Sequence, residues 1–305
     1  MNSYQLMIDI WEGNPVASLD AEVLKEAGVV GAFVRLNDMG GGHHMDEQFI
    51  TLWDWVNTHF ECNGIYFVYN PWPTGKQNYA WLKANLPADY HRRVANDVEV
   101  AKAGYSPEVY ADELGKFVAI ELGEGHAVAD YSGGWFTTLL SHWPVVDSWW
   151  AAYPDILTNS KSWTEYKANL LKLDFATWTR SAPHPAKLWQ CTGDHCILPG
   201  MGGHAVDINA YPGSLEDLRT WLGYAGTEPG TGLEPAPTGT GMHYEVLTPT
   251  LNIRRGPGLG YPIMGRLTAG AVVQAQDAGG SDVWIQIGDG QWVALETLGK
   301  RYLGR

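Results

Sequence analysis

A repeated alternation of short apolar runs and helix-like segments constrains the fold of the first 220 or so residues. The apolar runs are typical of buried strands, and the segments between them have helical periodicity. Strands are predicted at residues 6–10, 29–36, 64–69, 94–99, 127–131, 149–153, 187–190 and 205–208, and helices at residues 19–27, 46–59, 76–86, 107–122, 164–173 and 214–222. This repetition indicates an α/β fold with a mainly parallel sheet. Eight strands predict a TIM-like (β/α) barrel, with some later crossovers too short for a full helix.

A change in composition near residue 224 indicates a second domain. Residues 223–241 are rich in Gly, Pro and Thr and have no apolar period, which is typical of a linker. The short β runs after it, broken by Gly and Pro, predict a small all-β barrel. The predicted organisation is therefore a (β/α) barrel over residues 1–223, a linker over 224–241 and a small β domain over 242–305.

The charge distribution excludes one class of partner. The chain has 20 Lys and Arg against 34 Asp and Glu, for a net charge of −14. Most of the acidity belongs to the large domain, because the residues from 241 onward carry 6 basic and 5 acidic side chains. Such a chain repels phosphate backbones, so we expect no general nucleic-acid binding. No apolar run reaches the ~20 residues of a membrane span and no signal peptide is visible, so we expect no membrane insertion.

Four carboxyl side chains fall where predicted strands end, namely Asp9, Asp97, Glu99 and Asp207. Chemistry in a parallel barrel lies at the C-terminal ends of the strands, and barrel closure makes the first and last strands neighbours. Asp97 and Glu99 are two residues apart and project from the same face. We therefore expect all four at one mouth, where crowding raises some pKa values. Glycoside cleavage uses such a raised acid beside a second, negative group.

Two metal sites are alternatives to this interpretation. Hard cations bind in oxygen-rich loops, which these carboxylates do not show. Cys191 and Cys196, with Asp194 and His195 between them, allow a zinc site, but the spacing is not that of a standard ligand pair and no second pair exists. We expect neither a metal nor a cofactor. For any single one of the four carboxyl groups, the alternative is an acidic side chain in solvent at the surface.

At these residues the chain resembles the glycoside hydrolase family 25 lysozymes, the N-acetylmuramidases of phage endolysins and bacterial autolysins. Asn-Asp-Val-Glu at residues 96–99 matches the family's Asp-x-Glu signature. Similar segments follow in order along the large domain, at residues 7–11, 33–38, 64–69, 131–136, 149–153, 188–190 and 206–209.

The resemblance implies a role for each carboxyl group. Glu99 is the implied general acid and later the base, and Asp97 stabilises the transition state by holding the substrate's N-acetyl group. Asp9 and Asp207 complete the cluster and set its pKa values. The implied substrate-binding residues are Tyr66, Tyr131, Asp38, Trp149, Tyr153 and Trp189, although aromatic residues at strand positions are more often part of the core. Asp38 stands where the family has a longer Glu, which leaves its reach to the substrate open.

The implied reaction is hydrolysis of the β-1,4 bond between N-acetylmuramic acid and N-acetylglucosamine. Retention assisted by the N-acetyl oxygen is favoured, while a covalent glycosyl-enzyme and inversion stay open. A chitinase-type barrel is a rival, but Ala95 stands where its signature has an earlier Asp. A glucosaminidase is a second rival. A non-catalytic wall-binding protein is a third, and it would lose the acid that is present here as Glu99.

The C-terminal part resembles a bacterial SH3-like domain, at residues 251–257, 261–265, 283–287 and 290–294. The implied partner is bacterial peptidoglycan, its glycan bound by the barrel and its stem peptide by the SH3-like domain. A tethered module raises the local concentration of an enzyme at its polymer. The alternative is that this domain only packs on the barrel. The expected place of action is the bacterial cell wall, after secretion or release by host lysis.

Overall fold

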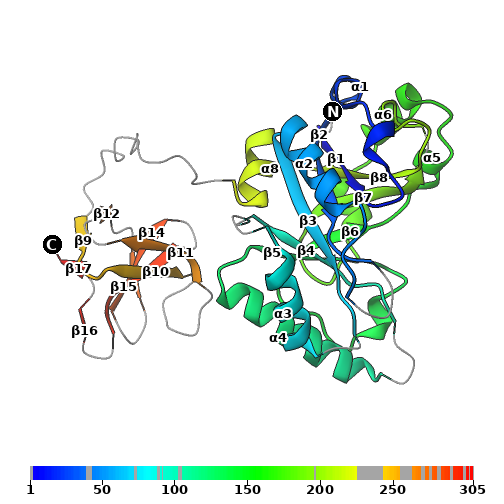
Figure 1. Ribbon diagram of the computed structural model, residues 1–305. Coiled ribbons are helices and arrows are strands. Elements are labelled where there is room, and N and C mark those ends of the chain that lie inside the picture. The colour runs from blue at the N-terminus through cyan, green and yellow to red at the C-terminus, as the bar shows by residue number, and fades with distance from the viewer. Residues whose placement is uncertain are drawn as a thin grey trace. The chain divides into compact units, whose positions relative to one another are not determined.

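Eight strands close into a barrel in the larger unit of the computed structural model (Figure 1). This unit comprises Met1–Glu121 and His126–Thr227, and a smaller unit contains Glu228–Arg305. The structure describes residues 3–38, 43–71, 74–87, 90, 92–101, 105–195, 197–224, 243–254, 263–268, 272–274, 277–279, 283–288, 291–297, 300–301 and 303–304. The predicted linker, apart from Tyr224, lies outside these residues.

The strands of the barrel follow one another in chain order around its wall. They are β1 (Gln5–Ile10), β2 (Val29–Arg35), β3 (Cys62–Val68), β4 (Val94–Asp97), β5 (Val128–Gly133), β6 (Asp147–Ala151), β7 (Ala186–His195) and β8 (Val206–Tyr211). Strands β1 to β7 are parallel, whereas β8 runs antiparallel to both β7 and β1 and closes the barrel. The predicted α/β fold with a mainly parallel, TIM-like barrel is therefore confirmed.

Helices lie outside the strands and match the six predicted segments. The longer ones are α1 (Ala21–Ala27), α2 (Phe49–His59), α3 (Gly75–Asn85), α4 (Pro107–Gly123), α6 (Trp163–Leu170) and α8 (Leu215–Leu222). The shorter ones are η1 (Val16–Ser18), η2 (Thr137–Leu139), α5 (Asp155–Thr158) and α7 (Phe175–Thr179). Ser214 caps α8, since its hydroxyl accepts a hydrogen bond from the N–H of Asp217 at 3.1 Å. Among the described residues, η2 alone joins β5 to β6 and no helix joins β7 to β8, so some of the later crossovers are shorter than a full helix, as expected.

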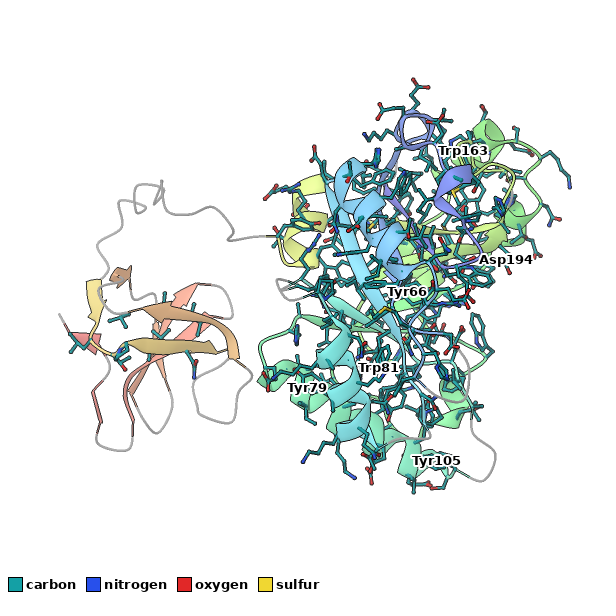
Figure 2. All side chains as sticks on the ribbon, in the orientation of Figure 1. Tyr66, Tyr79, Trp81, Tyr105, Trp163 and Asp194 are labelled. Carbon is teal, nitrogen blue, oxygen red and sulfur yellow. The ribbon has the colours of Figure 1, made fainter. Side chains whose placement is uncertain are left out.

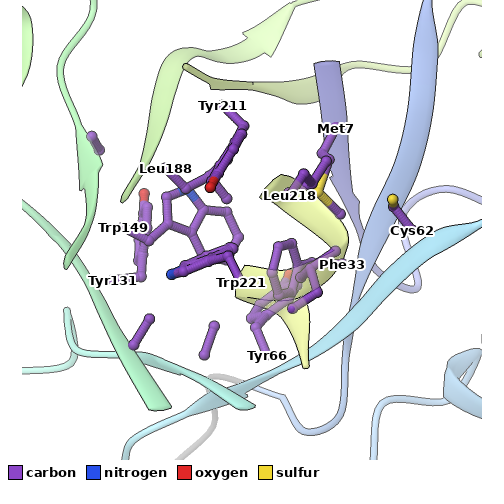
Figure 3. Close-up of a cluster of buried hydrophobic side chains, with 14 of the residues drawn as sticks. Met7, Phe33, Cys62, Tyr66, Tyr131, Trp149, Leu188, Tyr211, Leu218 and Trp221 are labelled. Atoms are coloured by element: carbon purple, nitrogen blue, oxygen red, sulfur yellow. The ribbon is translucent and has the colours of Figure 1, made fainter. Parts of the chain in front are cut away.

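Aromatic and aliphatic side chains fill the interior of the barrel (Figure 3). The rings of Phe33 and Trp149 meet there, with centroids 4.7 Å apart. Gly64 on the neighbouring strand makes room for Phe33, because a Cβ at that position would lie 2.3 Å from the ring. Because these side chains fill the interior, the barrel is not an open pore, and a ligand can approach it only at an end of the strands.

The smaller unit is built of strands in its described residues, which confirms the all-β prediction. They are β9 (His243–Val246), β10 (Thr250–Arg254), β11 (Ile263–Thr268), β12 (Val272–Gln274), β13 (Asp277–Gly279), β14 (Val283–Gly288), β15 (Gln291–Thr297), β16 (Lys300–Arg301) and β17 (Leu303–Gly304). One sheet has the order β11-β10-β15-β14-β13 with β16 beside β15, and the other has the order β12-β9-β17. Among the described residues, no helix combines the length and the apolar character that a membrane span requires.

Candidate active site

A cavity of about 490 Å³ opens at the end of the barrel where strands β1 to β7 finish. Its lining is rich in carboxyl and aromatic side chains and contains Asp9, Trp11, Glu12, Arg35, Asp38, Tyr66, Asp97, Glu99, Tyr131, Trp149, Gln190 and Asp207. Tyr66, from the C-terminal half of β3, is labelled in Figure 2. The structure thus brings together eight of the ten predicted site residues, all except Tyr153 and Trp189.

Asp207 lies at this mouth, but for a different reason from the predicted one. It does not close its strand but is the second residue of β8. Because β8 is antiparallel to its neighbours, its beginning lies at the mouth where the other strands end. The register pairs Asp207 with Asp9 on β1, so the two carboxyl groups meet across the closing seam of the barrel.

Gln190 on β7 holds the carboxyl groups and the tyrosines of the site together. Its side-chain Nε2 donates to Oδ2 of Asp9 and to Oδ2 of Asp207, both at 3.2 Å. Its Oε1 accepts from the hydroxyl groups of Tyr131 at 2.8 Å and Tyr153 at 2.5 Å. One buried amide therefore fixes four side chains that come from four different strands or strand ends.

All four predicted carboxyl groups have raised pKa values. Burial is the largest cause in each case, because the charged form loses its hydration. The charge of Asp207 raises the pKa of both Asp9 and Glu99 further, and the charge of Glu99 raises that of Asp97. The pKa of Asp207 rises to about 6, although the backbone N–H of Asp194 stabilises its charged form. The cluster therefore retains protons at pH values where isolated carboxyl groups have lost them.

Asp97 and Glu99 differ in ways that suit different roles. Asp97 is buried at the end of β4, and its Oδ1 has no hydrogen-bond partner among the described residues. Glu99 lies two residues further on and is half-buried at the cavity wall. An acceptor oxygen without a partner can bind a donor of the ligand, and a half-buried acid with a raised pKa can transfer a proton.

A cation in the cavity lining, Arg35 at the end of β2, was missed by sequence reasoning. Arg35 is buried, and its Nε binds Oδ2 of Asp46 at 2.8 Å while its Nη2 lies 3.2 Å from Oε1 of Glu12. The guanidinium carbon also lies 4.5 Å from the ring centroid of Trp11, an exposed residue of the cavity lining. Trp11, Glu12 and Arg35 lie at or just after the ends of β1 and β2, where chemistry in a parallel barrel is expected. This position is the signal that could have indicated them.

Trp189 lies away from the cavity, so the expectation that it is part of the substrate site is corrected. Its side chain is fully buried, stacks on Trp178 with centroids 6.2 Å apart, and donates from Nε1 to the carbonyl of Ala152 at 2.7 Å. Its neighbour Gln190 points the other way, into the cavity, because successive strand residues alternate between faces. Tyr153 lies beside the cavity through its bond to Gln190.

No group of three or more His, Cys, Asp or Glu side chains within the described ranges has the arrangement of a metal site. The buried thiol of Cys191 donates to the carbonyl of Ile208 at 3.2 Å, and burial raises its pKa to about 12. A thiol held in this form is a poor zinc ligand. Cys196, the other cysteine of the alternative zinc site, lies outside the described residues.

Comparison with known proteins relates both units to characterised folds. Residues 249–299 match the family described as the bacterial SH3 domain. A search of curated protein sequences finds no match. Among solved structures, a family 25 glycosyl hydrolase from Bacillus anthracis is 19% identical with a TM-score of 0.55, and the alignment covers 73% of this chain and 95% of that one.

Two further structures extend the comparison. A bacterial lysozyme from Streptomyces coelicolor is 17% identical over 72% of this chain and 97% of that chain, with a TM-score of 0.55. The spore cortex lytic enzyme SleM from Clostridium perfringens is 16% identical over 99% of this chain and 97% of that chain, with a TM-score of 0.56. The larger unit thus has the barrel fold of the family 25 glycosyl hydrolases. More particularly, the chain combines that fold with a C-terminal segment that matches the bacterial SH3 domain.

Proposed function

We propose that the protein is a peptidoglycan hydrolase that cleaves the β-1,4 bond between N-acetylmuramic acid and N-acetylglucosamine. The observation that carries the proposal is the cluster of four carboxyl groups with raised pKa values in one cavity at the mouth of a family 25-type barrel. The order of motifs along the chain, above all Asp97 and Glu99, supports the same activity.

In the proposed reaction Glu99 gives its proton to the glycosidic oxygen as the bond between that oxygen and C1 breaks. The open Oδ1 of Asp97 accepts the N–H of the substrate's N-acetyl group, so that the acetyl oxygen attacks C1. Water then attacks C1 as the bond between C1 and the acetyl oxygen breaks, and it gives a proton to Glu99. The two inversions at C1 give net retention. Asp9 and Asp207 act through their charge, because each raises the pKa of a neighbouring carboxyl group.

The SH3-like domain has its proposed ligand in the same polymer, where it binds the stem peptide while the barrel binds the glycan. The protein therefore acts at the bacterial cell wall, which it reaches by secretion or by release on host lysis. Both points rest on the match to the bacterial SH3 domain and on the barrel fold.

Digestion of purified peptidoglycan tests the proposal, with mass spectrometry of the borohydride-reduced products. We expect the wild type to release fragments that end in reduced N-acetylmuramic acid, and Glu99→Gln to lower the rate by at least ~100-fold, since general acid catalysis contributes about 10²–10⁴-fold. Glu26→Gln is the matched control, because Glu26 is exposed near the end of α1, where the chain enters β2 at the far end of the barrel. It should digest at the wild-type rate.

The other outcomes separate the rival functions. Reduced N-acetylglucosamine ends would replace the muramidase with a glucosaminidase on the same barrel. Retained binding to walls without any release by the wild type would indicate a non-catalytic wall-binding protein. Cleavage of N-acetylglucosamine polymers in preference to peptidoglycan would indicate a chitinase.

A further inference from the structure

Two exposed aromatic side chains lie beside the cavity and are not part of its lining. Trp135, which follows β5, is 52% exposed, and Tyr153, which follows β6, is 38% exposed. Trp135 has the largest exposed fraction among the tryptophans whose side chains the structure describes. The two rings pack on each other, with centroids 5.8 Å apart and planes inclined by 35°. Exposure of such large apolar surfaces next to a site indicates a binding function.

The pair is linked to the carboxyl cluster through the side chain of Gln190. The hydroxyl of Tyr153 donates to Oε1 of Gln190, the amide that also binds Asp9 and Asp207. This bond fixes the ring of Tyr153 relative to the cavity. The pair therefore continues the cavity on the side of β5 and β6.

Two glycines leave room for the rings of Trp135 and Tyr153. A Cβ at Gly133, the last residue of β5, would lie 2.3 Å from the ring of Trp135, so only glycine allows the ring to rest there. A Cβ at Gly193 on β7 would lie 3.3 Å from the hydroxyl oxygen of Tyr153. Trp135 thus has one part of its ring against the backbone and about half of its surface in solvent. A pre-positioned ring loses little conformational entropy when it binds a ligand.

We propose that Trp135 and Tyr153 form a sugar-binding subsite that continues the catalytic cavity and stacks one neutral N-acetylhexosamine ring of the glycan. The proposal rests on the proposed function, which supplies a polymer that extends beyond the cleaved bond. The C–H-bearing face of a pyranose ring fits the electron-rich face of an aromatic side chain. A neutral sugar is favoured over an anionic ligand because Asp9, Glu99 and Asp207 lie close by and repel negative charge.

Binding of peptide-free glycan strands to the full-length chain tests the subsite. The parent is Glu99→Gln, which keeps the cavity but does not consume the ligand, and binding is measured by calorimetry. We expect Trp135→Ala in this parent to weaken binding of long strands by about tenfold, while binding of a single disaccharide changes less than twofold. Trp135→Phe keeps an aromatic face and should stay within about threefold of the parent.

Leu139→Ala is the matched control, since Leu139 is an exposed apolar residue of η2 in the same connection but is not aromatic. It should bind like the parent. Equal binding of long strands by Trp135→Ala and the parent would overturn the subsite and leave the proposed function intact. No binding by the parent, together with no peptidoglycan cleavage by the wild type, would overturn both. Thermal unfolding of each variant shows whether a loss of binding reflects a loss of folding.

Discussion

At the scale of single residues, the side chain that most shapes the site is an amide rather than an acid. Gln190 stabilises the charged form of Asp9 by donating a hydrogen bond, which opposes the effect of burial on its pKa. The same amide orients Tyr131 and Tyr153 through its oxygen. In the proposed reaction Gln190 is therefore a positioning residue, which acts through the groups that it holds.

Replacing Gln190 by Leu should lower kcat/KM by about 10- to 100-fold, because a hydrogen bond to a charged group contributes roughly 1.5–3 kcal/mol. Without the amide the pKa of Asp9 rises further, so its ionised form appears only at higher pH. The acidic limb of the pH–rate profile should therefore move to higher pH. The check is kcat/KM on soluble glycan fragments from pH 3 to 8. A reduced rate with an unmoved profile would mean that Gln190 only supports the packing.

At the scale of elements, strand β4 carries polar side chains to both of its faces. Asp97 points into the barrel, whereas Asn96 points outward and is fully buried below helix α4. The Nδ2 of Asn96 donates to Oε2 of Glu121 at 2.8 Å and to Oδ1 of Asp130 at 3.1 Å. Burial raises the pKa of Asp130 to about 7 and places that of Glu121 well above its usual range. Asp130 and Glu121 therefore lie behind strand β4, and their ionisation costs stability.

Replacing Asp130 by Asn should make the free energy of unfolding less dependent on pH. The pKa of Asp130 is higher in the folded chain than in the unfolded chain, so folding favours the protonated carboxyl group. The stability that the protonated Asp130 contributes is complete below about pH 4 and is lost as the pH rises toward 7. At about 1.4 kcal/mol per pH unit, Asp130→Asn should gain a few kcal/mol relative to the wild type between pH 4 and pH 7. Urea unfolding at pH 4, 5.5 and 7 measures the difference.

The control for this experiment is Asp54→Asn, since Asp54 is exposed on helix α2. Its stability relative to the wild type should stay constant over the same pH range. A constant difference for Asp130→Asn as well would show that Asp130 ionises at the same pH in the folded and the unfolded chain.

The sequence predicts the elements of this barrel better than their relations in space. Apolar periodicity identifies all eight strands, and carboxyl groups at or near strand ends indicate the mouth. Periodicity is the same for both directions of a strand, so the reversal of β8 and the place of Asp207 at its start could not be predicted. Periodicity also leaves open which face is inside. Trp149 faces the cavity, whereas Trp150 and its register partner Trp189 lie away from it.

Contacts between side chains that are distant in sequence also could not be predicted. The bond between Gln190 and Asp9 joins residues 181 positions apart, and the pairing of Arg35 depends on Asp46 and Glu12 from two separate loops. Such contacts follow only from the closed barrel. The sequence could therefore name the carboxyl groups of the site, but not the residues that position them.

At the scale of the whole molecule, the charge is divided unevenly between the two units. The chain carries a net charge of −14, and the part from residue 241 onward carries 6 basic and 5 acidic residues, so the barrel holds nearly all of the negative charge. An anionic wall repels such a barrel at low ionic strength. In the proposed function the nearly neutral SH3-like domain offsets this repulsion, because its binding to the wall keeps the barrel near the polymer regardless of charge.

Truncation after Thr227, the last residue of the larger unit, should therefore reduce lysis of intact walls by at least ~10-fold at low salt, given that tethering commonly adds 10²–10⁴-fold in avidity. Hydrolysis of soluble glycan fragments should not change, since the described residues that line the cavity come from the larger unit. Raising the ionic strength from about 10 to 150 mM shortens the screening length from about 30 to 8 Å and should restore part of the truncated protein's activity on walls. Turbidity clearing of wall suspensions and product release from soluble fragments measure the two activities.

Equal clearing by both forms would show that the SH3-like domain does not deliver the barrel to its substrate. An equal loss of activity on soluble fragments would show that truncation damages the barrel itself.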